Sequence, residues 1–402
     1  MRFSGVKIAG AERRETAKNG DGMRSEIEKA NALEDAHSRI ELPGLLAMRC
    51  YAALSIVLVH LIALPRLQIP SYLSFIPAHF GNGVPLFYIV SAFGLFVGYR
   101  GKIETRQKLR EFYLRRFLRI APLFYFIMVF YIPFCWTMWG TTIPLSQFVS
   151  SALFVFNFVP RQASGFVMAS WSIGVEMAFY AILPLLVFAI TGIARSLVFL
   201  VVAIFLAANW ALAFQGTEGS LALFGQLSMI AHLFYFAAGI AGYYVWLRLR
   251  GTSPWIGRIV LWGGLLSIVG LIYLANPLAA LLGTVLGPSG GSGVKAAWAV
   301  TLAGAVVGVS LHPQKSFVNP VAKILGNASF SIYLWHPVVI VVLDRLGAYR
   351  ALYASLDGVS LPFFSSVIAT LAVLIPLSFL SYRYIERPGM ALGGRVSRLR
   401  PA

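Results

Sequence analysis

Few residues of this chain combine an ionisable side chain with apolar neighbours, and two of them are spaced for joint chemistry. Arg49 and His60 lie 11 residues apart in a largely apolar segment. At 3.6 residues per turn this is almost three turns, so both lie on one helix face, roughly 16 Å apart along the axis. Ionisable groups inside a membrane span are functional candidates. The alternatives are an Arg49 that extends to the lipid headgroups and a His60 that only packs between helices.

Glu176 and His336 lie in two other segments that fit membrane-spanning helices. Counted along their helices, His60 and Glu176 lie roughly 22 Å from the inner end, and His336 lies roughly 18 Å from it. The sequence therefore predicts that the three side chains meet in one layer. Such a group could form a general base with an orienting carboxylate, or the proton relay of a transporter. A metal site is not expected, because the ligand-spacing motifs of metal sites are absent from the sequence.

A basic cluster precedes the third apolar segment, in the run EFYLRRFLRIAPLFY. Arg116 and Arg119 are three residues apart, so they share a helix face. Arginine binds phosphate oxygens in a bidentate manner, so the pair could hold a multiply phosphorylated cytosolic ligand or lipid headgroups. The simpler interpretation is that these residues set the topology of a membrane protein.

Composition places these residues in a membrane protein. Of the 402 residues, 58% are hydrophobic and 12% are charged, and the mean hydropathy is +0.76. A soluble domain has about 25% charged residues. The net charge of +18 therefore indicates cytoplasmic Lys and Arg rather than a nucleic-acid partner. Cys50 and Cys135 both lie in apolar segments and form neither a disulfide framework nor a metal motif.

Ten apolar segments are long enough to cross a bilayer as helices. They cover roughly residues 45–64, 80–98, 118–138, 171–192, 196–214, 221–246, 255–275, 294–311, 324–343 and 361–383. Residues 143–160 are apolar but interrupted, which predicts an interfacial or re-entrant segment. The Gly/Ser/Pro run Gly287–Gly293 is expected to be a loop.

The predicted fold is an all-α polytopic membrane protein of about ten transmembrane helices. Residues 1–44 are expected to form a charged, disordered cytoplasmic tail, 45–388 the transmembrane domain, and 389–402 a basic cytoplasmic tail. With the N-terminus inside, 27 of the 33 Lys and Arg residues fall on the inner side and five on the outer side. This asymmetry predicts that both termini are cytoplasmic.

Six segments resemble, in order, the motifs of the acyltransferase-3 family of bacterial integral-membrane O-acyltransferases. The first is RCYAALSIVLVH, with its arginine and histidine 11 residues apart. The others are GNGVPLFYIVSAFGLF, RRFLRIAPLFY, WSIGVEMAFYAILP, LGNASFSIYLWHPV and YRYIERP. The resemblance spans about residues 45–388. Ala92 departs from it, because the family usually has glycine after the serine at Ser91, and a difference in helix packing is expected there.

The resemblance implies an acyl-CoA, by default acetyl-CoA, as the donor substrate, with no tightly bound cofactor. It implies a hydroxyl acceptor on a polysaccharide, lipopolysaccharide or lipid-linked glycan, and a multi-pass protein of the bacterial inner membrane. The residues alone also allow a proton-coupled transporter or an exporter of a lipid-linked sugar.

The resemblance also implies roles for individual residues. His60 is expected to be the catalytic base, and we add Glu176 as the carboxylate that orients it. A covalent acyl-histidine step stays open. Arg49, Arg116 and Arg119 are expected to bind the donor. The remaining motif positions, with less defined roles, are Ser91, Trp171, His336 and Glu386.

Overall fold

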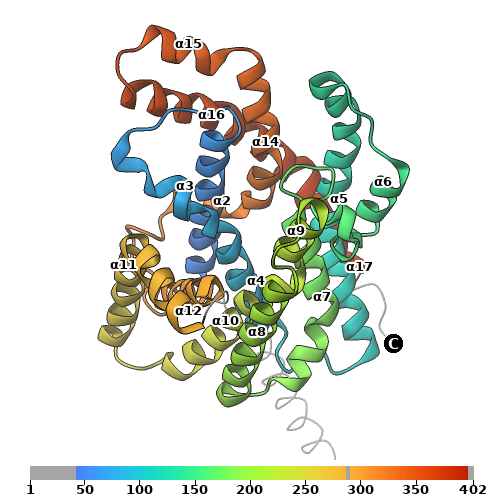
Figure 1. Ribbon diagram of the computed structural model, residues 1–402. Helices are drawn as coiled ribbons and strands as arrows, with labels where there is room; N and C mark the ends of the chain where they lie inside the picture. The colour runs from blue at the N-terminus through green and yellow to red at the C-terminus, as the bar shows by residue number, and fades with distance from the viewer. Residues whose placement is uncertain (1–41, 287–289, 397–402) are drawn as a thin grey trace, which may run out of the picture. The chain divides into compact units, whose positions relative to one another are not determined.

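A computed structural model describes residues 42–286 and 290–396, and every regular element within these ranges is helical (Figure 1). The long helices are α2 (Pro43–Ala63), α4 (Gly83–Tyr99), α5 (Arg106–Trp139), α7 (Trp171–Ala189), α8 (Ile193–Ala213), α10 (Met229–Leu249), α11 (Pro254–Leu286), α12 (Gly290–Leu311), α14 (Ser329–Arg345) and α16 (Ser360–Ser381). The shorter helices are α3 (Phe75–His79), α6 (Leu145–Ala152), α9 (Gly219–Leu227), α13 (Pro320–Asn327), α15 (Ala348–Ser355) and α17 (Arg387–Val396).

Nine spans in the described ranges are long and apolar enough to cross a membrane, and the bent pair α13–α14 makes a tenth. These ten correspond one to one with the ten predicted segments. The predicted all-helical, multi-pass fold is therefore confirmed. The cytoplasmic position of both termini stays a prediction. Residues 1–41 lie outside the described residues, and residues 389–396, expected in the C-terminal tail, belong to α17.

Local sequence explains where the site-bearing helices begin and end. The side chain of Thr105 accepts a hydrogen bond from the Lys108 backbone amide and caps α5, which ends at Gly140 in the left-handed conformation (φ 64°). Asn319 caps α13 in the same way through the Ala322 amide, with a proline at the first helical position. The caps satisfy amide groups that the helix leaves without partners.

Several spans are interrupted inside the protein. The N-terminal part of the second span consists of a 3₁₀ turn, α3 and a second 3₁₀ turn, and α4 begins only at Gly83. A Cβ atom at Gly83 would lie 2.6 Å from the carbonyl oxygen of Ala52, so α4 begins about halfway along α2. Between α13 and α14 the chain bends by 73°. Irregular backbone at membrane depth is tolerated where protein groups satisfy it.

The segment predicted to be interfacial or re-entrant supports a further interruption, between α9 and α10. Residues 143–160 form α6 and 3₁₀ turns, and Asn157 in one of these turns is 1% exposed. Its side-chain amide donates to the Leu227 carbonyl at 2.8 Å and its oxygen accepts from the Met229 amide at 3.0 Å. Leu227 ends α9 and Met229 begins α10. Asn157 thus pairs both backbone groups at this break.

The central helix is α2, which packs against α4, α13, α14 and α12 (Figure 1). Glycines allow its backbone to approach two of these neighbours closely. A Cβ at Gly326 of α13 would lie 2.0 Å from the Leu46 carbonyl oxygen, and a Cβ at Gly44 would lie 2.7 Å from the Val309 carbonyl oxygen of α12. This packing fixes the helix that carries Arg49 and His60.

The prediction of a loop at Gly287–Gly293 is wrong from Gly290 onward, because α12 begins at Gly290. A Cβ at Gly290 would lie 2.7 Å from the backbone nitrogen of Gly283 in α11. The absence of side chains lets α11 and α12 approach directly, so the helix starts within the glycine run. Residues 287–289 lie outside the described residues.

Candidate active site

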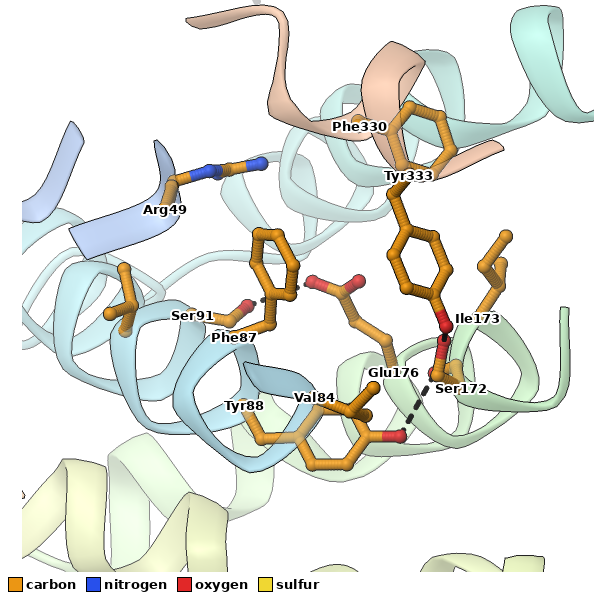
Figure 2. A pocket seen from close by; sticks show the side chains of 11 residues that line it. Arg49, Val84, Phe87, Tyr88, Ser91, Ser172, Ile173, Glu176, Phe330 and Tyr333 are labelled. Atoms are coloured by element: carbon orange, nitrogen blue, oxygen red, sulfur yellow. Dashed lines mark hydrogen bonds between the residues drawn. The ribbon is translucent and has the colours of Figure 1, made fainter. Parts of the chain in front are cut away.

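A cavity of about 40 Å³ lies between α2, α4, α7 and α14 (Figure 2). This volume holds roughly two or three water molecules. Arg49 reaches it from α2, Ser91 from α4, Glu176 from α7 and Tyr333 from α14. The other lining residues are Val84, Phe87, Tyr88, Val90, Ser172, Ile173 and Phe330. Three residues that the sequence singled out therefore share one cavity.

Glu176 is held by two hydroxyl groups. The Ser91 hydroxyl donates to Glu176 Oε1 at 2.9 Å, and Tyr180, one turn further along α7, donates to the same oxygen. The charge of Glu176 also acts on Arg49. These contacts join α2, α4 and α7 around a carboxylate, a geometry that fixes the position of the carboxylate.

The predicted pairing of Glu176 with His60 is wrong, since the hydrogen-bond partners of Glu176 are Ser91 and Tyr180. The reason is the start of α7. Tyr333, only four residues from the start of α14, donates to the Ala169 carbonyl at 2.8 Å, just before α7 begins. The first turn of α7 is therefore enclosed by α14. A count that places Trp171 at the end of a membrane span gives the wrong position for Glu176 along α7 relative to His60.

His60 meets another histidine instead. His60 Nδ1 lies 3.3 Å from His336 Nε2, and the ring centroids are 4.9 Å apart. His60 Nδ1 is also 3.0 Å from the Ile56 carbonyl oxygen, and His336 Nδ1 is 2.5 Å from the Tyr333 carbonyl oxygen. His336 is 0% exposed. The two imidazoles form a fixed pair between α2 and α14.

Arg49 on α2 and Arg119 on α5 lie close enough for their charges to interact, and Arg116 is one turn before Arg119 on the same helix. Arg49 Nε donates to Ser329 Oγ at 3.1 Å, and the charge of Arg119 acts on Arg49. Arg116 donates to the Tyr99 hydroxyl at 3.1 Å and lies over the Tyr99 ring, 5.3 Å from its centroid. Among the described residues, the ion pair found is Arg115–Glu111 at 3.7 Å on the surface of α5. The three site arginines therefore have no carboxylate at ion-pair distance within the described chain.

Glu386 lies at the edge of this arginine group. It ends a π-helical turn (Tyr382–Glu386), is 1% exposed, and accepts a hydrogen bond from Ser331 Oγ at 2.9 Å. The charges of Arg119 and Arg49 act on it. Trp171 lies apart from these groups, because its ring packs on His232 with centroids 5.1 Å apart and does not line the cavity.

Several functional contacts were missed by reasoning from the sequence. These are the tyrosines at 99, 180 and 333 and the serines at 329 and 331, which hold the arginines, the carboxylates and the histidine pair. Ser329 carried a usable signal, because it lies seven residues, or about two helical turns, before His336. The tyrosines are indistinguishable in sequence from interfacial aromatic residues. In residues 42–286 and 290–396, no three His, Cys, Asp or Glu side chains come together as metal ligands do.

Ala92, the departure from the family pattern, lies on α4 beside the cavity wall. It is fully buried, and it faces Gly239 of α10. A Cβ at Gly239 would lie 3.0 Å from the Ala92 Cβ and 2.4 Å from the Ile89 carbonyl oxygen. The close approach of α4 and α10 thus uses a glycine on α10.

The fold and the site together define a multi-pass membrane protein with a buried polar centre that combines a histidine pair, carboxylates and arginines. A family model described as an acyltransferase domain, that of the acyltransferase-3 family, matches residues 42–383. The chain belongs to this family and is an acyltransferase, which confirms the resemblance seen in its motifs. Comparison with curated proteins and with solved structures gave no match.

Proposed function

We propose that this acyltransferase moves an acyl group, acetyl in the first instance, from cytoplasmic acyl-CoA to a hydroxyl of a cell-envelope polysaccharide or lipid-linked glycan, in a bacterial inner membrane. The observation that supports acyl-CoA as the donor is the group of three arginines. The charges of Arg49, Arg116 and Arg119 all interact with the Tyr180 hydroxyl. None of the three has a carboxylate at ion-pair distance in the described chain. All three side chains are partly buried, and charges withdrawn from water are normally paired or bound to a ligand. The phosphates of CoA are suitable partners for these guanidinium groups.

The cavity supports a route from the arginines toward the histidines. Arg49 and Tyr333 both line it, and the Tyr333 ring contacts the His336 ring with centroids 5.5 Å apart. Along α2, Arg49 and His60 are separated by a rise of roughly 16 Å. In the proposal, the phosphates of the donor dock at the arginines, and its thin pantetheine arm extends along α2 to bring the thioester to His60.

The chemistry at the thioester requires one base. In the proposed step, His60 takes the proton of the acceptor hydroxyl as the hydroxyl oxygen attacks the thioester carbonyl carbon. The C–O bond forms, the C–S bond breaks, and the CoA thiolate takes up the proton from His60. The products are the O-acyl ester and free CoA thiol.

Glu176 takes a different role from the one its sequence position indicated. We propose that it holds Ser91 and balances the charge of Arg49 at the cavity, which keeps the donor-binding guanidinium in place. Glu386 acts in the same way on Arg119 and Arg49.

The position of His60 in α2 indicates from which side of the membrane the acceptor binds. His60 lies in the last turn of this helix, which ends at Ala63. If the N-terminus is cytoplasmic, as the Lys and Arg asymmetry predicts, this end of α2 faces the periplasm. The acceptor hydroxyl would then reach His60 from outside, while the donor binds from inside.

The test is a comparison of arginine variants in nanodiscs, with thiol release from acetyl-CoA as the readout and an envelope extract as the acceptor. Arg119→Ala and Arg116→Ala should raise KM for acetyl-CoA by tenfold or more, because each removes a charge-assisted bond worth about 1.5–3 kcal/mol. Arg110→Ala is the matched control, since Arg110 lies on the same helix with an exposed side chain. Equal KM values in all three variants would contradict the proposed donor site. Release with succinyl-CoA but not acetyl-CoA would change the acyl group and keep the site.

A further inference from the structure

We propose that His336 is a positioning residue that holds His60 in the tautomer whose Nε2 is free to act as the base. The proposal rests on the proposed function of His60. It draws on three distances that link the two rings to the backbone, and it gives His336 the task that a carboxylate performs in a Ser-His-Asp triad.

The tautomer of His336 follows from its backbone contact. Its Nδ1 lies 2.5 Å from the Tyr333 carbonyl oxygen, and a carbonyl oxygen can only accept a hydrogen bond. His336 Nδ1 therefore carries a proton. In a neutral imidazole the other nitrogen has the lone pair, so Nε2 of His336 presents an acceptor to His60.

The tautomer of His60 then follows in turn. Its Nδ1 lies 3.0 Å from the Ile56 carbonyl oxygen and 3.3 Å from His336 Nε2. Both neighbours are acceptors, so Nδ1 must carry the proton that they share. The proton-free nitrogen of His60 is Nε2, which none of these contacts occupies. A base needs a bare nitrogen, and this arrangement supplies it before substrate binds.

The same contact acts during the reaction. When His60 accepts a proton at Nε2, both of its nitrogens become donors and the ring becomes positive. The lone pair of His336 Nε2 remains directed at Nδ1–H and stabilises this charge. The carboxylate of Glu176 is hydrogen-bonded elsewhere, to Ser91 and Tyr180. His336 thus takes the orienting role that the sequence suggested for Glu176.

Two substitutions separate this role from packing. In His336→Gln the longer side chain places an amide oxygen, an acceptor, near the position of Nε2. In His336→Asn the shorter side chain places its amide near the position of Nδ1 only. The asparagine can still donate to the Tyr333 carbonyl but offers no acceptor to His60. We expect kcat to fall about tenfold more in His336→Asn than in His336→Gln, the effect of one hydrogen bond of ordinary strength. The residual activity of His336→Asn reflects the Ile56 carbonyl, which still holds His60 Nδ1–H.

The tautomers are read directly by ¹⁵N NMR of the imidazole rings in the full-length protein, at a pH where the histidines are neutral. The His60 signals are assigned by their loss in His60→Gln, and His312→Gln serves as a control outside the site. We expect Nδ1–H at His60 in the wild type and a larger Nε2–H population in His336→Asn. Nε2–H at His60 in the wild type would overturn the proposal, as would an unchanged tautomer in a folded His336→Asn.

The two readouts keep this proposal distinct from the proposed function. Expected tautomers in a protein that transfers no acyl group from any CoA thioester would refute the proposed function and leave the positioning intact. Acyl transfer that depends on His60, with Nε2–H at His60 in the wild type, would refute the positioning alone.

Discussion

The contact between α4 and α10 offers a test of how packing supports the site. Gly239→Ala would place a Cβ 2.4 Å from the Ile89 carbonyl oxygen, and contacts of this kind below 3.0 Å are essentially never seen. The two helices must therefore separate by about 0.6 Å, the difference between these two distances. Overpacking of this size costs about 1–3 kcal/mol of unfolding free energy.

The displacement also reaches the cavity, because Ser91 follows Ile89 by two residues on α4. If Ser91 moves away by the full 0.6 Å, its hydrogen bond to Glu176 lengthens from 2.9 Å to about 3.5 Å, the limit of such a bond. We expect a lower melting temperature together with a several-fold lower rate of acyl transfer.

The assay combines thermal unfolding in detergent with thiol release from acetyl-CoA. Gly270→Ala is the matched control, because a Cβ there meets nothing within 4 Å and alanine is the better helix former. Ala92→Gly, which restores the usual family residue, should not rescue Gly239→Ala, because the Ile89 carbonyl still blocks the Cβ. A Gly239→Ala protein as stable and active as Gly270→Ala would refute this reasoning.

Three further substitutions test other contacts. Asn157→Leu leaves two buried backbone groups without partners, so it should lower the unfolding free energy by roughly 2–6 kcal/mol, measured by thermal or denaturant unfolding. Tyr99→Phe removes the hydroxyl that binds Arg116 but keeps the ring beneath the guanidinium, so KM for acetyl-CoA should rise a few-fold, and more in Tyr99→Leu. Arg49→Lys keeps the charge but loses the Nε–H bond to Ser329, and KM should rise about tenfold. Wild-type values in any of these variants would argue against the corresponding contact.

The membrane spans could be predicted because a bilayer demands about 20 apolar residues per helix, and ten such segments are visible in the chain. The position of a residue along the length of its span was harder to predict. The count for His60 and His336 brought the two residues together, as observed, because α2 runs from Pro43 to Ala63 without a break and His336 lies two turns after the start of α14 at Ser329. The count for Glu176 failed because α7 begins inside the protein, where the Tyr333 hydroxyl binds the Ala169 carbonyl.

The partners of the site residues were equally hard to predict from sequence. Two imidazoles face each other at 3.3 Å only because α2 and α14 pack together, and no local pattern encodes that contact. The same holds for Tyr99 beneath Arg116, which joins α4 to α5. Ordered motifs identified the residues, whereas helix packing determined which of them meet.

The central claim is that His60 is the base for acyl transfer from acyl-CoA, and one measurement tests it most directly. Purified wild type and His60→Ala, both shown to be folded by thermal unfolding, receive acetyl-labelled acetyl-CoA and an envelope extract in nanodiscs. The label is then followed into alkali-labile O-acetyl ester. We predict ester formation by the wild type and a rate at least 10²-fold lower in His60→Ala, the smaller end of the usual range for general-base catalysis. A folded His60→Ala protein that forms ester at the wild-type rate would contradict the account.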